Sequence, residues 1–95
     1  MDAKFRSVLN YCDLFLEGNN LLVFHCANGI YIAENYIRMI EHEINDYPFL
    51  VLENVSLAIY GSNKITYTTN VFNIAIDQIV GVTAMTKELF ASIYK

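Results

Sequence analysis

Residues 19–54 constrain the fold most, because this stretch contains three segments separated by recognisable turn residues. Residues 21–24 (LLVF) form a short apolar run, which is typical of a strand, and Asn28-Gly29 is a turn dipeptide. A segment with helical periodicity follows and stops at Pro48, directly before the apolar run 49–52 (FLVL). The order strand, helix, strand predicts a crossover unit in which residues 21–24 pair in parallel with residues 49–52.

The helix expected in this unit spans residues 31–45 and has one apolar stripe. The members of the stripe recur at helical spacing and are Ala33, Tyr36, Ile37, Ile40 and Ile44. The opposite face carries Glu34, Arg38, Glu41, His42 and Asn45. An exposed ion pair such as Glu34 with Arg38 stabilises a helix only slightly, so we expect the apolar stripe to hold this helix in place.

The N-terminal segment allows two interpretations. A helical template is matched by Phe5, Val8, Leu9, Cys12 and Leu16. However, Cys12, Leu14 and Leu16 also alternate, and the turn cluster 17–20 leads directly into the first apolar run, as in a hairpin. The first ten residues therefore stay open, and we favour a strand from about Tyr11.

The second half of the chain contains strand and helix signals. Alternating residues on both sides of the turn 61–63 predict, when read locally, a β-hairpin over residues 55–70. Residues 74–84 contain a short apolar run that predicts a second buried strand. Thr86 is the expected N-cap of a last helix, with Glu88 in its first turn. The residues expected to face inward from this helix are Leu89, Phe90 and Ile93.

The composition limits the classes of function. The chain has 95 residues, enough for a single domain spanning 1–95, and 55% of them are hydrophobic, which excludes a disordered chain. The net charge is −4 without a basic run, so we expect no nucleic-acid partner. No apolar run approaches the roughly 20 residues of a membrane span, and no signal-peptide core follows Met1. These features predict a cytoplasmic protein in which Cys12 and Cys26 are small buried hydrophobic residues.

The polar residues form no recognisable catalytic or cofactor site. His25 adjoins Cys26, but neighbours in a strand point to opposite faces. His42 lies between Glu41 and Glu43, and neighbours on a helix do not converge on one ion. The four glycines match neither a dinucleotide fingerprint nor a Walker motif. We therefore expect no catalytic residue, no metal and no cofactor.

Three short motifs follow one another in the chain: Asn28-Gly29-Ile30, Tyr47-Pro48-Phe49, and Asn54 with Ser56. They resemble a small STAS-like domain family (SpoIIAA-like fold) of Bacteroidetes-type bacteria. Members of that family run from a strand through an x-E-G-I turn into a helix, and then into a K-P-F-x-x-I strand followed by N-x-x-x-S-Y-S. Residues 76–95 (IDQIVGVTAMTKELFASIYK) are similar to the later strand and helix of the family. Leu57-Ala58-Ile59 depart from the pattern, because they stand where the polar S-Y-S would be.

The resemblance implies an α/β fold in which helices pack on one face of a mixed sheet. It also implies a loop and a short helix within residues 61–73 in place of the local hairpin. Some STAS domains carry a phosphorylated Ser or Thr at a helix start, in a D-S-S/T-G context. The nearest candidates for such phosphorylation are Ser62 and Thr66, and the D-S-S-G motif itself is absent.

The resemblance leads to a non-enzymatic regulatory or protein-interaction module as the first hypothesis for function. One alternative is a roadblock- or profilin-like α+β dimerisation scaffold, which requires a purely antiparallel sheet. Another is a small carrier of apolar ligands, with a cavity among the Tyr and Phe side chains. The family pattern continues past residue 95 into one more strand and helix, so we expect either a homodimer that covers the exposed sheet edge or a chain that lacks its natural C-terminus.

Overall fold

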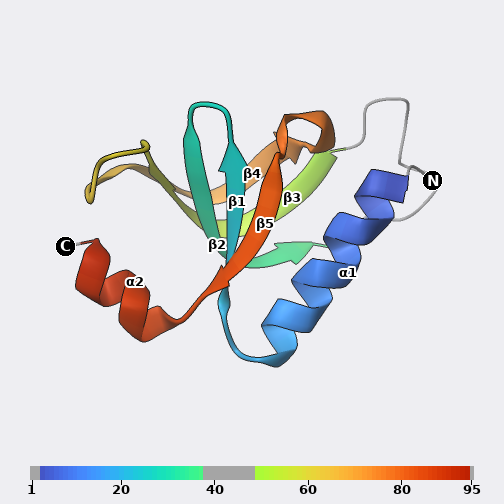
Figure 1. The fold of residues 1–95 in the computed structure, drawn as a ribbon, viewed down its shortest axis with the longest axis horizontal. Coiled ribbons are helices and arrows are strands. Elements are labelled where there is room, and N and C mark those ends of the chain that lie inside the picture. The colour runs from blue at the N-terminus through green and yellow to red at the C-terminus, as the bar shows by residue number, and fades with distance from the viewer. Residues whose placement is uncertain (1–2, 38–48, 95) are drawn as a thin grey trace.

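The computed structural model describes residues 3–37 and 49–94. In that part of the chain, five strands form one sheet, accompanied by two α-helices and one short 3₁₀ turn (Figure 1). The elements, in chain order, are α1 (Ala3–Glu17), β1 (Leu21–Cys26), β2 (Gly29–Ile37), β3 (Phe49–Ala58), β4 (Ile65–Ala75), η2 (Ile76–Gln78), β5 (Gly81–Met85) and α2 (Lys87–Ile93).

The sheet has the strand order β4-β3-β2-β1-β5, and every neighbouring pair is antiparallel. The predicted parallel pairing of residues 21–24 with 49–52 is therefore wrong, because β2 lies between β1 and β3. The expected mixed sheet is also wrong for the described strands. A chain that combines one sheet with helices is confirmed, and antiparallel pairing throughout is what the roadblock- or profilin-like alternative requires.

The helix predicted for residues 31–45 is wrong for its first part. Residues 31–37 belong to β2, which pairs with β1 and β3. The remaining residues of that prediction, 38–45, lie outside the described residues. Ala33 and Tyr36 are both buried in the same hydrophobic cluster, although residues three apart in a regular strand point to opposite faces. A local reversal of the pleat therefore produced the spacing that the sequence analysis interpreted as helical.

At the N-terminus the helical interpretation is confirmed, and the strand favoured from Tyr11 is wrong. The buried residues of α1 are Phe5, Val8, Leu9 and Cys12, at helical spacing. Leu14, which the alternating pattern required to be buried, is 57% exposed. Asn19, in the connection between α1 and β1, has φ = 59°, a conformation that asparagine tolerates better than most residues.

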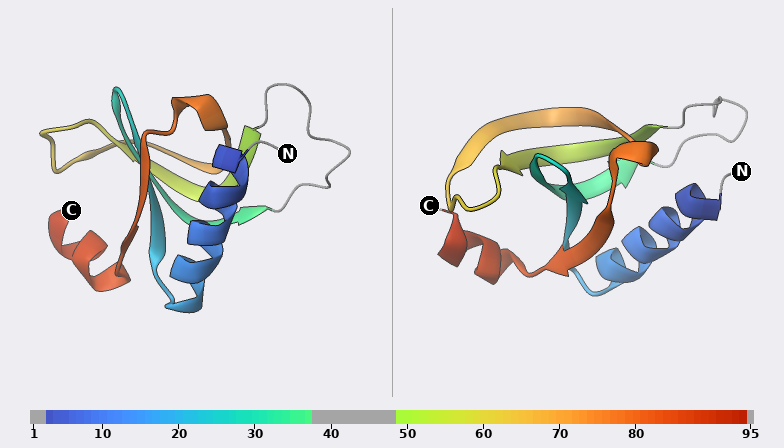
Figure 2. Two further views of the ribbon diagram at one scale, coloured as in Figure 1. Left: turned by 45° about the vertical axis from the view of Figure 1, so that its right-hand side comes forward. Right: turned by 45° about the horizontal axis from the view of Figure 1, so that its top comes forward.

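The two faces of the sheet pack against different helices, so the expectation of helices on one face is wrong. The buried residues of α1 join a large cluster with Leu22 and Phe24 of β1. On the other face, Leu21 and Val23 of β1 form a smaller cluster against which Phe90 of α2 packs. Figure 2 shows α1 along the sheet and α2 standing at the end of β5. Residues 21–24 of β1 form an unbroken apolar run because helices cover both faces of the strand.

The hairpin predicted locally for residues 55–70 is confirmed, because β3 and β4 pair across that region. The short helix implied by the resemblance within residues 61–73 is wrong, since β4 occupies 65–75. The single buried strand predicted within residues 74–84 is wrong, because these residues comprise the end of β4, η2 and the start of the edge strand β5, and Val80 is 81% exposed. The N-cap at Thr86 is confirmed: its side chain accepts a hydrogen bond from the Leu89 N–H at 3.0 Å. Leu89 itself is 48% exposed, so its predicted inward position is wrong.

Candidate functional site

The outer edge of β4 is the most unusual surface of the described structure. β4 is the outermost strand, and its inner side pairs with β3 from Ala75 opposite Phe49 to Ile65 opposite Ala58. Among residues 3–37 and 49–94, no strand pairs with its outer side. We name residues 65–75 along this side the β4 edge. A strand at the edge of a sheet presents backbone N–H and C=O groups that can pair with another chain.

The local sequence explains why β4 is a long strand. Its eleven residues, ITYTTNVFNIA, are mostly β-branched or aromatic, which favours a pleated and half-exposed conformation. The hairpin turn begins after β3, where Gly61 adopts φ = 82° and the Ser62 N–H donates to the Ile59 carbonyl at 3.0 Å. A positive φ is available to glycine without steric cost. The turn therefore returns the chain along the full length of β3.

The β4 edge lacks the features by which sheet edges avoid association. Natural edge strands are blunted by charged side chains, proline or a very short length. β4 contains no charged residue and no proline, and its eleven residues are about twice the usual strand length of 5–6 residues. The opposite edge strand, β5, has only five residues and continues into α2. The β5 edge is thus short, as is usual for a protected sheet edge, whereas the β4 edge is long and uncharged.

Side chains on β4 add apolar surface beside the unpaired backbone. Tyr67 is 56% exposed and Val71 is 54% exposed. The first charged residues on either side are Lys64, directly before the strand, and Asp77, two residues after it, and both are exposed. The β4 edge is therefore an uncharged strip with a positive charge at one end and a negative charge at the other.

The phosphorylation candidates lie near this edge but not at a helix start. Ser62 is exposed in the β3–β4 turn, where its hydroxyl accepts a hydrogen bond from the Lys64 N–H at 3.1 Å. Thr66 is in β4 and donates to the Leu57 carbonyl at 3.1 Å. The helical context that the resemblance requires for a phosphorylated residue is absent at both positions, since residues 62–66 form a turn and the start of a strand.

His25 takes part in a small polar cluster on the α2 side of the sheet. Its Nε2 atom lies 3.0 Å from Oγ1 of Thr83 on the neighbouring β5, and its Nδ1 atom lies 3.4 Å from the hydroxyl of Tyr60. Cys26 is buried in the cluster on the opposite face, as the strand alternation predicted. Within the described ranges, no three His, Cys, Asp or Glu side chains are grouped closely enough to hold a metal ion. His42 lies outside those ranges.

Both cysteines are free and buried in the core. Burial and, to a smaller extent, the charge of neighbouring Asp13 raise the pKa of the Cys12 thiol from 9.0 to about 12. Burial also raises the pKa of Cys26, although Lys4 acts in the opposite direction. Because the thiolate is the reactive form, neither cysteine is suited to act as a nucleophile at neutral pH.

The sequence contains a signal for the β4 edge that the motif search missed. Residues 65–76 form a run of twelve without a charged residue, bounded by Lys64 and Asp77.

None of the described helices combines the length and the apolar character that a membrane crossing requires. Comparison with protein-family models, with curated proteins and with solved structures found no match to this chain. The candidate site therefore rests on the geometry of β4.

Proposed function

We propose that this protein is a non-enzymatic protein-interaction module that acts by adding a strand to its β4 edge. The single observation that supports this proposal is the unpaired, uncharged, eleven-residue edge of β4. In strand addition, the backbone groups of the edge supply most of the affinity, and side chains on alternate positions supply specificity. Tyr67 and Val71 are exposed residues available for that second role.

The partner that fits this edge best is a second copy of the chain. Two antiparallel β4 strands related by a two-fold axis form a self-complementary interface, in which the same residues are used twice. The register that overlaps all eleven residues places Asn70 opposite Asn70 of the copy. Lys64 then lies at the level of Ile76 of the copy, next in sequence to Asp77, at both ends of the interface. The opposite charges at these ends attract each other, and the uncharged centre adds no repulsion.

The polar pairs of the described structure support a structural role for its carboxylates. The Tyr36 hydroxyl donates to the carboxylate of Asp13 and so connects β2 to α1. The Asn54 side chain donates to the carboxylate of Glu34 at 3.2 Å, between neighbouring strands. His25 faces hydroxyl groups instead of a carboxylate that would orient it as a general base.

The two free cysteines fit a reducing compartment, so we propose that the protein is cytoplasmic.

Two matched double variants test the proposal. Tyr67→Lys with Val71→Lys puts two positive charges on the β4 edge. Tyr11→Lys with Leu14→Lys puts the same charges on α1, also at the positions of an aromatic and an aliphatic residue. The four parent residues are almost equally exposed, at 56%, 54%, 55% and 57%. Each pair therefore changes charge and surface hydrophobicity to the same extent.

Light scattering coupled to gel filtration gives the expected readout. We expect the parent and the α1 variant to have twice the chain mass of 10.9 kDa, and the β4 variant to have the mass of one chain. Circular dichroism confirms that both variants are folded. If the α1 variant dissociates and the β4 variant does not, the interface lies on the helix and the proposal is wrong.

A charge exchange at Asn70 tests the register. We expect Asn70→Lys and Asn70→Asp each to be monomeric alone, because two like charges then face each other across the interface. Mixing the two variants in equal amounts brings opposite charges together, and we expect it to restore the dimer. A mixture that stays monomeric while the parent is dimeric would contradict the register centred on Asn70.

A further inference from the structure

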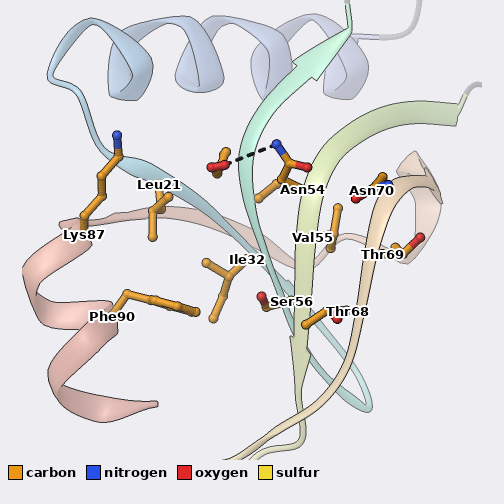
Figure 3. A pocket seen from close by; sticks show the side chains of 12 residues that line it. Leu21, Ile32, Asn54, Val55, Ser56, Thr68, Thr69, Asn70, Lys87 and Phe90 are labelled. Carbon is orange, nitrogen blue, oxygen red and sulfur yellow. Dashed lines mark hydrogen bonds between the residues drawn. The ribbon is translucent and has the colours of Figure 1, made fainter. Parts of the chain in front are cut away.

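A cleft of about 680 Å³ lies between α2 and the sheet, on the face opposite α1. Figure 3 shows α2 on one side of this cleft and β3 and β4 on the other, with β1 and β2 between them. Small-molecule sites have volumes of roughly 300–1,000 Å³, so the cleft has the size of a site for one small ligand. Residues 68–70 of β4 line one side of the cleft, so the cleft adjoins the proposed interface at Asn70.

The cleft contains the place where the pleat of the sheet reverses. Leu52 and Val55 are three residues apart in β3, yet both are buried in the cluster on the α1 face. Asn54 between them has φ = 52°, in the left-handed region. The strand partners of Asn54 at this level are Glu34 of β2 and Asn70 of β4, as the constant register on both sides shows. The reversal thus places one row of polar side chains across three strands, and all three line the cleft.

A second row of side chains lies beside the first. Ile32 pairs with Ser56, and Ser56 pairs with Thr68, so these three residues form a transverse row across β2, β3 and β4. Neighbouring strands are about 4.8 Å apart, and residues two positions apart along a strand are separated by roughly 6.6 Å. Asn54, Asn70, Ser56 and Thr68 therefore form a small grid of hydroxyl and amide groups.

Beside this polar grid, the cleft has an apolar part. It consists of Leu21, Ile32 and the ring of Phe90, which packs against the small cluster on the α2 face. The Phe90 ring lies 5.3 Å from that of Tyr94 at an interplanar angle of 41°, so its position is set by a second aromatic ring. The cleft carries two charged residues of opposite sign, Glu34 and Lys87, so its formal charge is zero.

We propose that this cleft binds a small, uncharged, hydroxyl-rich molecule with one apolar face, of which a monosaccharide or disaccharide is the chemical type. Hydroxyl and amide side chains both donate and accept hydrogen bonds, as sugar hydroxyl groups do. The C–H face of a sugar ring is apolar and suits the ring of Phe90 and the side chain of Ile32. A fully apolar ligand would leave the polar grid without partners, which costs binding free energy. This chemistry differs from that of the apolar carrier considered from the sequence.

Nuclear magnetic resonance titration of the uniformly ¹⁵N-labelled protein tests the proposal. The probes are glucose, N-acetylglucosamine and cellobiose at concentrations up to tens of millimolar, with glycerol as the control for non-specific effects. We expect at least one sugar, but not glycerol, to shift the backbone amide signals of Asn54, Ser56, Thr68 and Phe90 in a saturable manner. Hexanoate is the apolar probe, and we expect weaker shifts from it at the same residues.

Two variants and a control complete the test. Thr68→Val removes one exposed hydroxyl with little change in shape, and we expect at least a fivefold weaker affinity for the sugar. Phe90→Ala removes the aromatic ring from the apolar part of the cleft and should abolish saturation. Phe49→Ala removes a 42% exposed ring that does not line the cleft, and we expect the parent affinity. The proposal is overturned if no sugar produces saturable shifts at the cleft, if hexanoate binds there more tightly, or if Thr68→Val binds as the parent does.

Discussion

The hydrogen bond between Tyr36 and Asp13 provides the sharpest test of how α1 is fixed to the sheet. Tyr36 is 8% exposed, and its hydroxyl donates to a carboxylate oxygen of Asp13. The substitution Tyr36→Phe keeps the ring and removes only the donor, so it creates no cavity. Hydrogen bonds to charged groups contribute about 1.5–3 kcal/mol to stability. Asp13 is only half-buried, which favours the lower part of that range.

We therefore expect Tyr36→Phe to lower the free energy of unfolding by about 2 kcal/mol. For a domain of this size, that change lowers the Tm by roughly 8–16 °C. Urea unfolding followed by circular dichroism measures the free energy, and calorimetry measures the Tm. Tyr11→Phe is the matched control, because Tyr11 is 55% exposed on α1, and its variant should stay within about 0.5 kcal/mol of the parent.

A double-mutant cycle separates this bond from other effects of the two side chains. Asp13→Ala combined with Tyr36→Phe should destabilise the protein by at least 0.5 kcal/mol less than the sum of the single variants, as is typical of residues in contact. If Tyr36→Phe unfolds at the same urea concentration as the parent, or if the two changes are additive, the bond does not fix α1 to β2 and this reasoning is wrong.

Three further changes test other parts of the structure. Gly29→Ala should lower the Tm, because an added Cβ atom would lie 2.5 Å from the Ala58 carbonyl oxygen, and overpacking costs about 1–3 kcal/mol. Thr86→Ala removes the N-cap of α2 and should cost about 1 kcal/mol of local stability, measured by hydrogen exchange of the Leu89 and Phe90 amides. Because the pKa of Cys12 rises from 9.0 to about 12 on folding, the unfolded chain loses the thiol proton first as pH increases. The contribution of Cys12 to the free energy of unfolding is complete below pH 9 and decreases up to about pH 12, by roughly 1.36 kcal/mol per pH unit. In urea titrations over this pH range, the free energy of unfolding of Cys12→Ala should decrease less than that of the parent.

The sequence predicted those elements whose pattern is set by local chemistry. The hairpin of residues 55–70 was visible because alternating strands flank a glycine-containing turn, and the Thr86 cap was visible because threonine precedes an acidic first turn. The apolar spacing of Phe5, Val8 and Cys12 also indicated α1 correctly. In each case residues close together in the sequence determine the element, so the prediction required no knowledge of distant contacts.

The errors arose where tertiary contacts change the meaning of a pattern. The run 21–24 was interpreted as a parallel strand because a helix was predicted between it and residues 49–52, whereas residues 31–37 belong to β2, which pairs antiparallel with both. The pleat reversal at Glu34 placed Ala33 and Tyr36 on one face and imitated a helix. Which strands are neighbours depends on contacts that no local pattern contains.

The candidate site was predictable only in part. The exposed sheet edge expected from the sequence was attributed to elements beyond residue 95, whereas among residues 3–37 and 49–94 the long edge without a partner strand is that of β4. The charge-free run 65–76 was present in the sequence, but an absence of charge indicates an interface only when the strand is known to be outermost. The polar grid of the cleft was not predictable, because it joins residues of three strands through a register that the sequence does not specify.

Hydrogen exchange of the β4 backbone amides tests most directly whether β4 pairs with a second strand. In an antiparallel pair, neighbouring residues along a strand direct their N–H groups alternately to the two sides. Pairing with β3 alone therefore protects alternate amides of residues 65–75, whereas pairing on both sides protects consecutive amides. We expect consecutive protection along β4, which decreases on dilution as the dimer dissociates. Alternating protection that does not depend on protein concentration would show that the β4 edge stays unpaired, and it would contradict the proposed function.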